Sequence, residues 1–159
     1  MAIEIERKFL LISNDWRNSI ETTLEMSQGY LSCDAQSAVR VRICGEQANI
    51  NIKSTRDGIY RLEYEYSIPV EDARELVKYV ARRPVIRKKR HIVHFDGKCW
   101  EIDEFEQENA GLIVAEVELE SVDEDFSRPP WLGREVSTDA RYYNSNLSRL
   151  PYSVWQDEA

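Results

Sequence analysis

The first strong pattern in the chain is an alternation between apolar and charged residues over residues 3–11. At a period of two residues, most large apolar side chains fall on one face, and Glu4, Glu6 and Lys8 fall on the other. This alternation predicts a β-strand that buries one face. The second face carries two carboxylates and an ammonium group, and later segments also alternate apolar with charged residues. The chain is therefore expected to form a sheet with one strongly charged face.

Eight segments have this strand pattern, and short turns link most of them. The predicted strands span residues 3–11, 24–32, 38–43, 49–53, 61–66, 85–95, 98–105 and 112–120. Gly29 lies inside the second strand and predicts a bulge or the close approach of another backbone. The dipeptides Asp57-Gly58 and Asp96-Gly97 predict hairpins. Eight strands joined in this way indicate a closed or nearly closed antiparallel barrel within a single domain spanning residues 1–159.

Three further segments have helical signals. Residues 15–20 follow a capping residue, and residues 70–81 have an apolar stripe that is predicted to pack on the sheet. Asp139 can cap a terminal helix that reaches residue 149, because Pro151 prevents its continuation. The stretch around residues 127–130 is predicted to be irregular. The fold class is thus α+β, a barrel with outer helices and a C-terminal helix.

The charged face of the predicted strands gathers both signs of charge. Its members are Glu4, Glu6, Lys8, Arg40, Arg42, Lys53, Arg61, Glu63, Glu65, Lys88, Arg90, Asp103, Glu116 and Glu118. Periodicity does not decide whether this face points outward or into the barrel, and an apolar lumen is the usual arrangement in small barrels. Two features favour the inward orientation. The charges cluster by sign on different strands, and Tyr64, Tyr66 and Trp100 make the opposite face bulky enough to pack against outer helices.

Composition limits the class of partner. The 159 residues carry a net charge of −8, which makes broad binding of nucleic acid or of an anionic membrane unfavourable. The three cysteines have no CxxC spacing and are predicted to be free thiols in a cytoplasmic protein. No apolar run approaches the length of a membrane span, and no signal peptide is visible.

The charged residues also occur in a characteristic order. Glu4-x-Glu6-x-Lys8 forms an ExExK pattern. The motifs that follow it are Arg40-x-Arg42, Lys53, Glu63-x-Glu65, Lys88-x-Arg90, Asp103 and Glu116-x-Glu118. In this order the motifs resemble those of CYTH-domain proteins of the triphosphate tunnel metalloenzyme superfamily, over residues 3–144. The resemblance implies an eight-stranded tunnel with its charged face inward, a short bacterial-type inorganic triphosphatase, and a C-terminal helix that plugs one tunnel mouth. The other interpretation of that helix is packing on the outside of the barrel.

The residue types fit this activity. A triphosphate requires fixed cations, and the candidate substrate ligands are Lys8, Arg40, Arg42, Lys53, Arg61, Lys88 and Arg90. Carboxylates cannot hold phosphate directly, so acids in the same lumen imply Mg²⁺ or Mn²⁺. The candidate metal ligands are Glu4, Glu6, Glu63, Glu65, Asp103, Glu116 and Glu118. The expected reaction is divalent-metal-dependent hydrolysis of inorganic tripolyphosphate to pyrophosphate and phosphate.

Lys8 and Tyr30 are the candidate catalytic pair, because the related enzymes activate water with a lysine and a tyrosine. Neighbouring guanidinium groups disfavour a charged lysine, whereas surrounding acids favour it. Lys8 is therefore either the general base or one more phosphate ligand, and Tyr30 is either its partner or part of the lumen wall.

Several alternatives stay open. Thiamine or nucleoside triphosphates offer the same three phosphates, and a non-catalytic polyphosphate-binding module would carry the same cations. Class IV adenylyl cyclases share the tunnel, but that branch carries a His-Phe pair shortly before ExExK, for which residue 3 leaves no room. A homodimer is also open, with Trp131 and Trp155 as candidate exposed aromatics.

Overall fold

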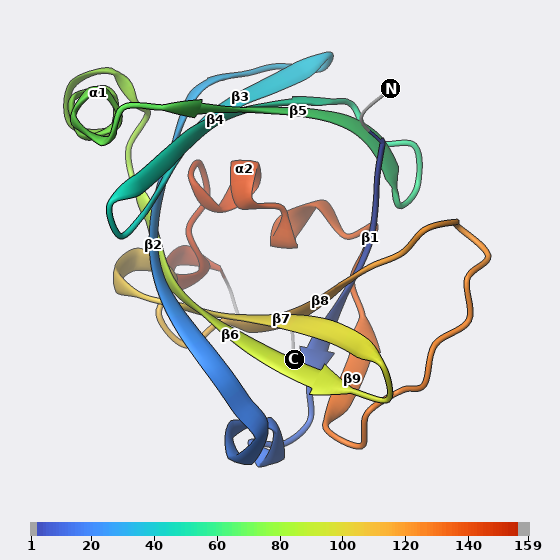
Figure 1. Ribbon diagram of the computed structural model, residues 1–159. Helices are drawn as coiled ribbons and strands as arrows, with labels where there is room; N and C mark the ends of the chain where they lie inside the picture. The colour runs from blue at the N-terminus through green and yellow to red at the C-terminus, as the bar shows by residue number, and fades with distance from the viewer. Residues whose placement is uncertain (1–2, 156–159) are drawn as a thin grey trace.

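The computed structural model describes residues 3–155, and its strands form one sheet. The strands are β1 Ile3–Leu11, β2 Ile20–Cys33, β3 Ser37–Cys44, β4 Gln47–Ser54, β5 Tyr60–Ile68, β6 Ile86–Phe95, β7 Lys98–Phe105, β8 Ile113–Glu118 and β9 Leu132–Glu135. The spatial order is β5-β4-β3-β2-β6-β7-β8-β1-β9, and β1 also pairs with β5. The first eight strands therefore close into the predicted antiparallel barrel (Figure 1).

Strand β1 closes the barrel. Its first residues, Ile3–Ile5, pair with β5, and residues 6–9 pair with β8. Beyond Ile5, β5 no longer pairs with β1. The same edge of β1 then pairs with β9, at Phe9 and Leu11. A strand of four residues gives too short a pattern to be found by periodicity, so β9, which begins just after the stretch predicted to be irregular, is not among the predicted strands. Gly133 in β9 passes so close to β1 that an added Cβ would lie 2.9 Å from the carbonyl oxygen of Leu10.

The main apolar core lies outside the barrel wall. Ile5 and Phe9 of β1, together with Trp100 of β7, point outward and pack under the segment that runs from residue 119 to β9. Trp131 of that segment is buried and meets Trp100 edge-on, with ring centroids 5.6 Å apart. The expectation that Trp131 is exposed was therefore wrong, because the covering segment turns it onto the barrel. Since the apolar face points outward, the charged face points inward.

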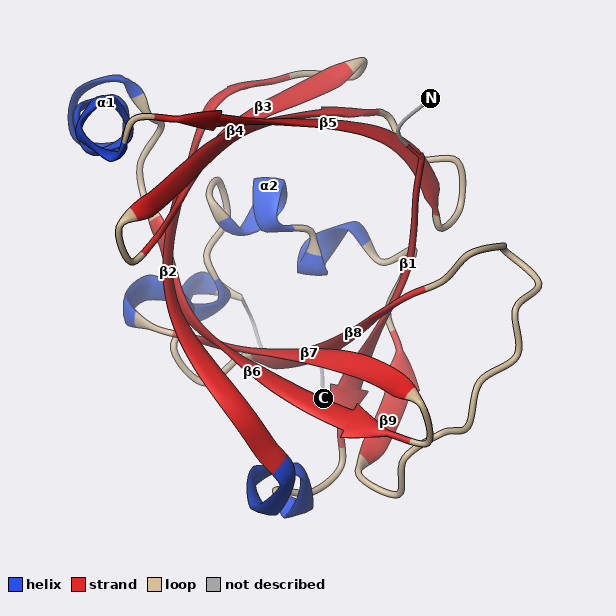
Figure 2. Ribbon diagram, in the orientation of Figure 1, coloured by secondary structure: helices blue, strands red, loops and turns tan. Residues whose placement is uncertain are grey.

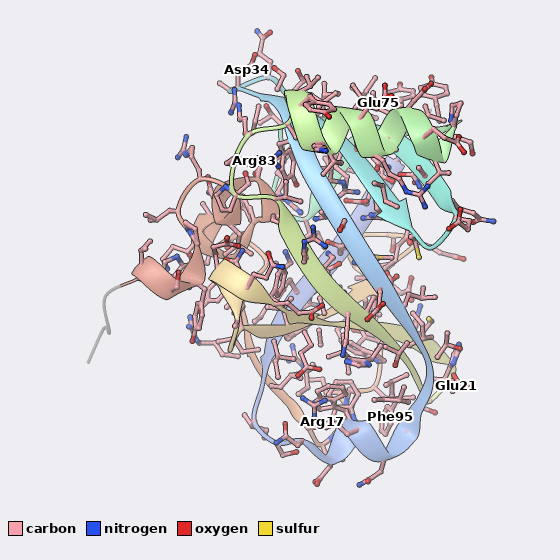
Figure 3. The ribbon with its side chains drawn as sticks, turned by 90° about the vertical axis from the view of Figure 1, so that its left-hand side faces the viewer. Arg17, Glu21, Asp34, Glu75, Arg83 and Phe95 are labelled. Carbon is pink, nitrogen blue, oxygen red and sulfur yellow. The ribbon has the colours of Figure 1, made fainter. Side chains whose placement is uncertain are left out.

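The helices are short. They are η1 Asp15–Ser19, α1 Val70–Glu75, η2 Leu76–Val80, η3 Gln107–Asn109, η4 Ala140–Tyr142, α2 Asn144–Leu147 and η5 Tyr152–Val154. The predicted helix at residues 70–81 corresponds to α1 followed by η2, whose π-type turn is closed by the bond from the Ala81 amide to the Leu76 carbonyl. Figure 3 shows this helix, which bears Glu75, on the outside of the wall. No helix among residues 3–155 is long and apolar enough to span a membrane.

Helix η2 packs directly on Gly29 of β2. A Cβ at Gly29 would lie 2.6 Å from the Cβ of Ala81, so only glycine lets the two backbones meet. The register of β2 against β3 also shifts between Tyr30 and Ser32. Of the two alternatives predicted for Gly29, the close approach is present at the glycine itself, and the register irregularity lies two residues further on, at Leu31.

The C-terminal segment lies across one end of the barrel (Figures 1 and 2). Tyr142 and Leu147 are buried against inward-facing apolar residues at that end, including Phe105 and Val114. The predicted plug is therefore confirmed, but the single helix expected over residues 139–149 is not. Asp139 accepts a hydrogen bond from the backbone of Arg141, and the backbone is extended at Tyr143, so η4 and α2 form as separate pieces.

Candidate active site

A cavity of about 210 Å³ lies inside the barrel, and its wall is almost entirely polar. Its cations are Arg40, Arg42, Lys53, Arg56, Arg61, Lys88 and Arg90. Its carboxylates are Glu4, Glu6, Glu63, Glu65, Glu101, Glu116 and Glu118. Tyr30 and the plug residues Tyr143, Asn144 and Ser145 complete it. The strand registers produce this wall, because inward-facing residues of one strand meet inward-facing residues of its neighbour.

Glu4 is surrounded by cations. Its carboxylate accepts from Arg61 Nε at 2.9 Å and from Lys53 Nζ at 3.4 Å. Lys53 is also 2.8 Å from Glu63. Burial favours the neutral acid, but the hydrogen bond with Glu63 and these two cations hold the pKa of Glu4 well below its usual value. Burial and the charges of Arg40 and Arg61 lower the pKa of Lys53 to about 8.

Asp103 lies behind the cavity wall. Its side chain is fully buried, and both oxygens bind Arg90, with Oδ1 2.8 Å from Nε and Oδ2 2.9 Å from Nη2. Oδ2 also accepts from Lys88 Nζ at 2.7 Å. Burial opposes ionisation, but the charges of Arg90 and Lys88 keep the pKa of Asp103 below its usual value. Asp103 thus holds two cavity cations in place and, in this arrangement, does not line the cavity itself.

Lys88 is the most deeply buried cation of the cavity wall. It is 1 % exposed, and burial lowers its pKa to about 7, although Asp103 acts in the opposite direction. Its ammonium also reaches Asn144 of the plug at 3.5 Å. A lysine that exchanges its proton near neutral pH can serve as a general base.

The carboxylates Glu6, Glu116 and Glu4 crowd one another. Burial, followed by the negative charges of Glu116 and Glu4, raises the pKa of Glu6 to about 8. A hydrogen bond joins Glu6 and Glu116, and Glu116 stays ionised because the charges of Lys8, Arg90 and Lys88 overcome its burial and lower its pKa. Acids forced together in this way fit a divalent cation, which would neutralise both.

The acids do not form a complete cage for a metal ion. Among residues 3–155, no three histidine, cysteine or acidic side chains converge closely enough to hold one. Magnesium usually keeps several waters and is bound by one or two carboxylates together with substrate phosphates. The paired acids of this cavity fit that kind of shared site.

Lys8 faces the plug. Its Nζ donates to the backbone carbonyl oxygen of Tyr142 at 3.0 Å and is 3.4 Å from Glu116. Lys8 is buried, but it does not line the cavity, whereas Tyr30 does. The structure therefore brings Tyr30 to the cavity with Lys88 and not with Lys8.

Five cavity residues were missed from the sequence. Glu101 lies two residues before Asp103 on β7, so the period of two could have found it. Arg56 lies in the connection between β4 and β5, and Tyr143, Asn144 and Ser145 belong to the plug, where no periodic signal exists. The charge of Arg56 lies 3.9 Å from Glu6.

Proteins similar to this chain share its length and fold. An inorganic triphosphatase of Acetivibrio thermocellus is 44% identical over 157 residues, which is 99% of this chain and 100% of that protein. An inorganic triphosphatase of Nitrosomonas europaea is 34% identical, covering 91% of this chain and 96% of that protein. A crystal structure of an inorganic triphosphatase, 33% identical, matches 91% of this chain and 97% of its own with a TM-score of 0.66. A protein from Pyrococcus horikoshii, 22% identical with a TM-score of 0.61, shares the fold over 76% of this chain and 80% of its own.

The family assignment follows from the sequence profile of the CYTH domain, which matches residues 2–150. Triphosphatases of this family depend in general on a metal ion. The match spans all eight barrel strands, the ExExK pattern and most of the plug. The chain belongs to the CYTH domain family.

Proposed function

We propose that this chain hydrolyses inorganic tripolyphosphate to pyrophosphate and phosphate inside its barrel, with Mg²⁺ or Mn²⁺ as the metal. The observation that carries the proposal is the enclosed polar cavity, in which cations and carboxylates share one wall. Cations alone would suit any anion. The added carboxylates suit a phosphate chain that arrives with a hard divalent metal.

The cations of the cavity would bind the phosphate oxygens. Arg40, Arg42, Lys53, Arg61 and Arg90 surround the space from β3, β4, β5 and β6, and the proposal gives Lys88, which lines the same space, a different role. Guanidinium groups bind two oxygens at once, and the Lys53 ammonium group acts as a point charge. The Nε of Arg40 is buried with no hydrogen-bond partner among the described residues, which leaves it free for the substrate.

The carboxylates would hold the metal ion. Glu4, Glu6, Glu116 and Glu118 belong to the adjacent strands β1 and β8, and Glu63 and Glu65 extend the acidic wall on β5. When bound, the metal would neutralise the terminal phosphoryl group and polarise it toward attack. We assign Asp103 the role of positioning Arg90 and Lys88, since both its oxygens are already used.

Water activation falls to Lys88 and Tyr30 in this proposal. Neutral Lys88 accepts the proton of the attacking water, and the Tyr30 hydroxyl orients that water from the same wall. The oxygen of the water bonds to the terminal phosphorus as the bond to the bridging oxygen breaks, and pyrophosphate leaves. Lys8, for which the sequence left open the roles of general base and phosphate ligand, would instead hold the plug through Tyr142.

The whole chain, residues 1–159, would act as one domain, although residues 1–2 and 156–159 lie outside the described part. We place it in the cytoplasm because Cys33, Cys44 and Cys99 are free thiols. Its partner is then the small triphosphate itself, with no nucleic acid or membrane. Trp155 packs on Tyr142 and Tyr152, so it gives a homodimer no added support.

The test is release of phosphate from tripolyphosphate, ATP, thiamine triphosphate and pyrophosphate, each with Mg²⁺, Mn²⁺ or EDTA. We expect metal-dependent cleavage of tripolyphosphate to one phosphate and one pyrophosphate, faster than cleavage of the other three. Formation of cyclic AMP and pyrophosphate from ATP would indicate a cyclase. Tight binding of tripolyphosphate without turnover would leave a binding module.

Variants of the acids test the metal assignment. Glu4→Gln and Glu6→Gln keep the shape of each side chain but remove the carboxylate that would bind the metal, so we expect turnover to be lost while calorimetric binding of tripolyphosphate persists. Glu46→Gln is the matched control, because Glu46 lies on the surface and pairs with the exposed Arg74. If both cavity variants keep turnover, these acids do not hold the metal.

A further inference from the structure

A second cavity of about 290 Å³ adjoins the active-site cavity beside the plug. It lies between the β2–β3 turn and the connection between β4 and β5. The two cavities share four residues of their walls, Arg56, Arg61, Tyr143 and Ser145. The plug therefore leaves a second pocket, open to solvent past the exposed Asp34 and Thr55, which we call the second chamber, and the four shared residues form the partition.

Arg56 and Tyr143 are the centre of this partition. The guanidinium carbon of Arg56 lies 4.8 Å from the centroid of the Tyr143 ring. The Arg56 side chain is only 12 % exposed, and its Nε has no hydrogen-bond partner among the described residues. Its ion pair with Glu6, at 3.9 Å, is long. Arg56 is thus held between the chambers mainly by its contact with one aromatic ring.

The second chamber has the chemistry of an anion site. Arg56 and Arg61 face it together with hydroxyl-bearing residues, and its acid is Asp34. The exposed Asp34 carboxylate accepts at Oδ1 from the backbone amides of Gln36 at 2.7 Å and Ser37 at 3.0 Å, and these bonds partly offset its negative charge. An additional phosphate group placed here would meet two guanidinium groups against this one carboxylate.

The frame around this chamber is fixed independently of Arg56. The backbone amide of Thr55 donates to the carbonyl of Gln36 at 3.1 Å, and the Thr55 hydroxyl donates to the carbonyl of Ala35. The turn and the neighbouring connection are therefore tied together. Removal of the Arg56 side chain would open the partition without releasing the frame.

We propose that the contact between Arg56 and Tyr143 sets the chain length of the substrate. With the contact closed, the active-site cavity ends at Arg56 and accepts three phosphates. With the contact open, a linear polyphosphate extends its fourth phosphate into the second chamber. This inference rests on the proposed triphosphatase function and adds a specificity-determining residue to it.

The experiment compares kcat/KM for tripolyphosphate and tetrapolyphosphate in the wild type, Arg56→Ala and Tyr143→Leu. Arg56→Ala removes the closing side chain, and Tyr143→Leu removes only the ring that holds it. We expect the tetra-to-tri ratio to rise in both, on the order of tenfold, which corresponds to about 1.4 kcal/mol. Arg56→Lys keeps the charge but cannot stack as a plane, so its ratio should lie between those of the wild type and Arg56→Ala.

Arg42→Ala is the matched cavity control, because Arg42 lines the active-site cavity and not the second chamber. Its loss should raise KM for both substrates and leave the ratio unchanged. If Arg56→Ala and Tyr143→Leu also leave the ratio unchanged, Arg56 is only another phosphate ligand and the proposal is wrong. Thermal unfolding of each variant verifies that it is folded.

Failure of the proposed function has a separate signature. In that case the wild type itself releases no phosphate from tripolyphosphate with any metal. The chain-length inference is then read from calorimetric affinities for the two polyphosphates, whose ratio should shift in the same variants. An unchanged affinity ratio would overturn the inference without reference to turnover.

Discussion

Lys8 and Lys88 arise from the same type of sequence pattern but have different surroundings. Both lie on inward-facing positions of barrel strands, and both are almost fully buried. Lys8 meets a backbone carbonyl of the plug, whereas Lys88 lies in the cavity wall, where burial lowers its pKa to about 7. Strand periodicity identifies both side chains as internal but cannot tell which one faces the substrate.

The first prediction concerns this pair. Lys88→Arg keeps a positive charge whose pKa is too high for a base, so we expect kcat to fall by roughly 10²–10⁴-fold with a smaller change in KM. In the wild type, kcat/KM should rise with pH through about 7 as Lys88 loses its proton, and the variant should lose this limb. Lys8→Met is the comparison and should keep the limb. The opposite result would return the role of base to Lys8.

The second prediction concerns Asp103. Asp103→Asn leaves Arg90 and Lys88 buried without their counter-charge, so the free energy of unfolding at pH 7 should fall by roughly 3–5 kcal/mol. Because the folded-state pKa of Asp103 is lowered, its contribution is present above the unfolded value near 3.8 and is lost as pH falls. Urea unfolding at pH 7 and at pH 3, below that unfolded value, measures both effects.

The control for Asp103 is Glu104→Gln on the neighbouring position. Glu104 pairs with Arg17 at the surface, where an ion pair contributes at most about 1 kcal/mol, and its Oε1 also lies 3.0 Å from Nε2 of the buried His91, so its loss is an upper limit for a surface pair. A loss as small in Asp103→Asn as in Glu104→Gln would mean that the buried cations find other partners.

At the scale of elements, strands were predictable and the segments that pack against them were not. The eight barrel strands and the helix at residues 70–81 repeat a period of two or 3.6, and each repeat is visible in the sequence. Strand β9 has four residues and depends on the free edge of β1. A single terminal helix does not form, because the Asp139 side chain accepts a hydrogen bond from the Arg141 amide and the backbone is extended at Tyr143. The Tyr143 ring contacts Arg56.

The third prediction tests the contact between β2 and η2. Gly29→Ala forces the new Cβ against Ala81, so we expect a loss of about 1–3 kcal/mol in the free energy of unfolding. Ala81→Gly removes the opposing methyl group, so the double variant should be more stable than Gly29→Ala. Denaturant unfolding of the two single variants and the double variant gives the coupling energy. If the stability changes of the two single variants simply add up in the double variant, the loss in Gly29→Ala does not come from a clash with Ala81.

At the scale of the whole molecule, the negative charge lies outside the active-site cavity. The chain carries a net charge of −8, yet among the described residues the seven cations that line this cavity are matched by seven carboxylates. The sequence predicted which residues share this face, because inward and outward positions alternate. It could not place Arg56, Asn144 or Ser145, which reach the cavity only through the path of a connection and of the plug.

The fourth prediction follows from the buried cations. Burial lowers the pKa of Lys53 to about 8, so this lysine is largely neutral at pH 9. A bound polyanion favours its charged form, and binding at pH 9 should therefore take up a proton. Affinity for tripolyphosphate without metal should fall as pH rises through 8. Calorimetry in two buffers of different ionisation enthalpy counts the protons, and Lys53→Arg should reduce the uptake, with Glu6 and Lys88 supplying the remainder.

The pairing of β1 also has a consequence for folding. This strand is synthesised first, yet it gains β8 and β9 only after residues 113–135 have been made. Its contacts are therefore among the most distant in sequence, and topologies rich in such contacts fold slowly. On the ribosome the edge of β1 that pairs with β8 stays unpaired until β8 has been synthesised, although β5 is available earlier. The strand β1, which carries the ExExK pattern, is thus the strand with the longest delay between its synthesis and the completion of its pairing.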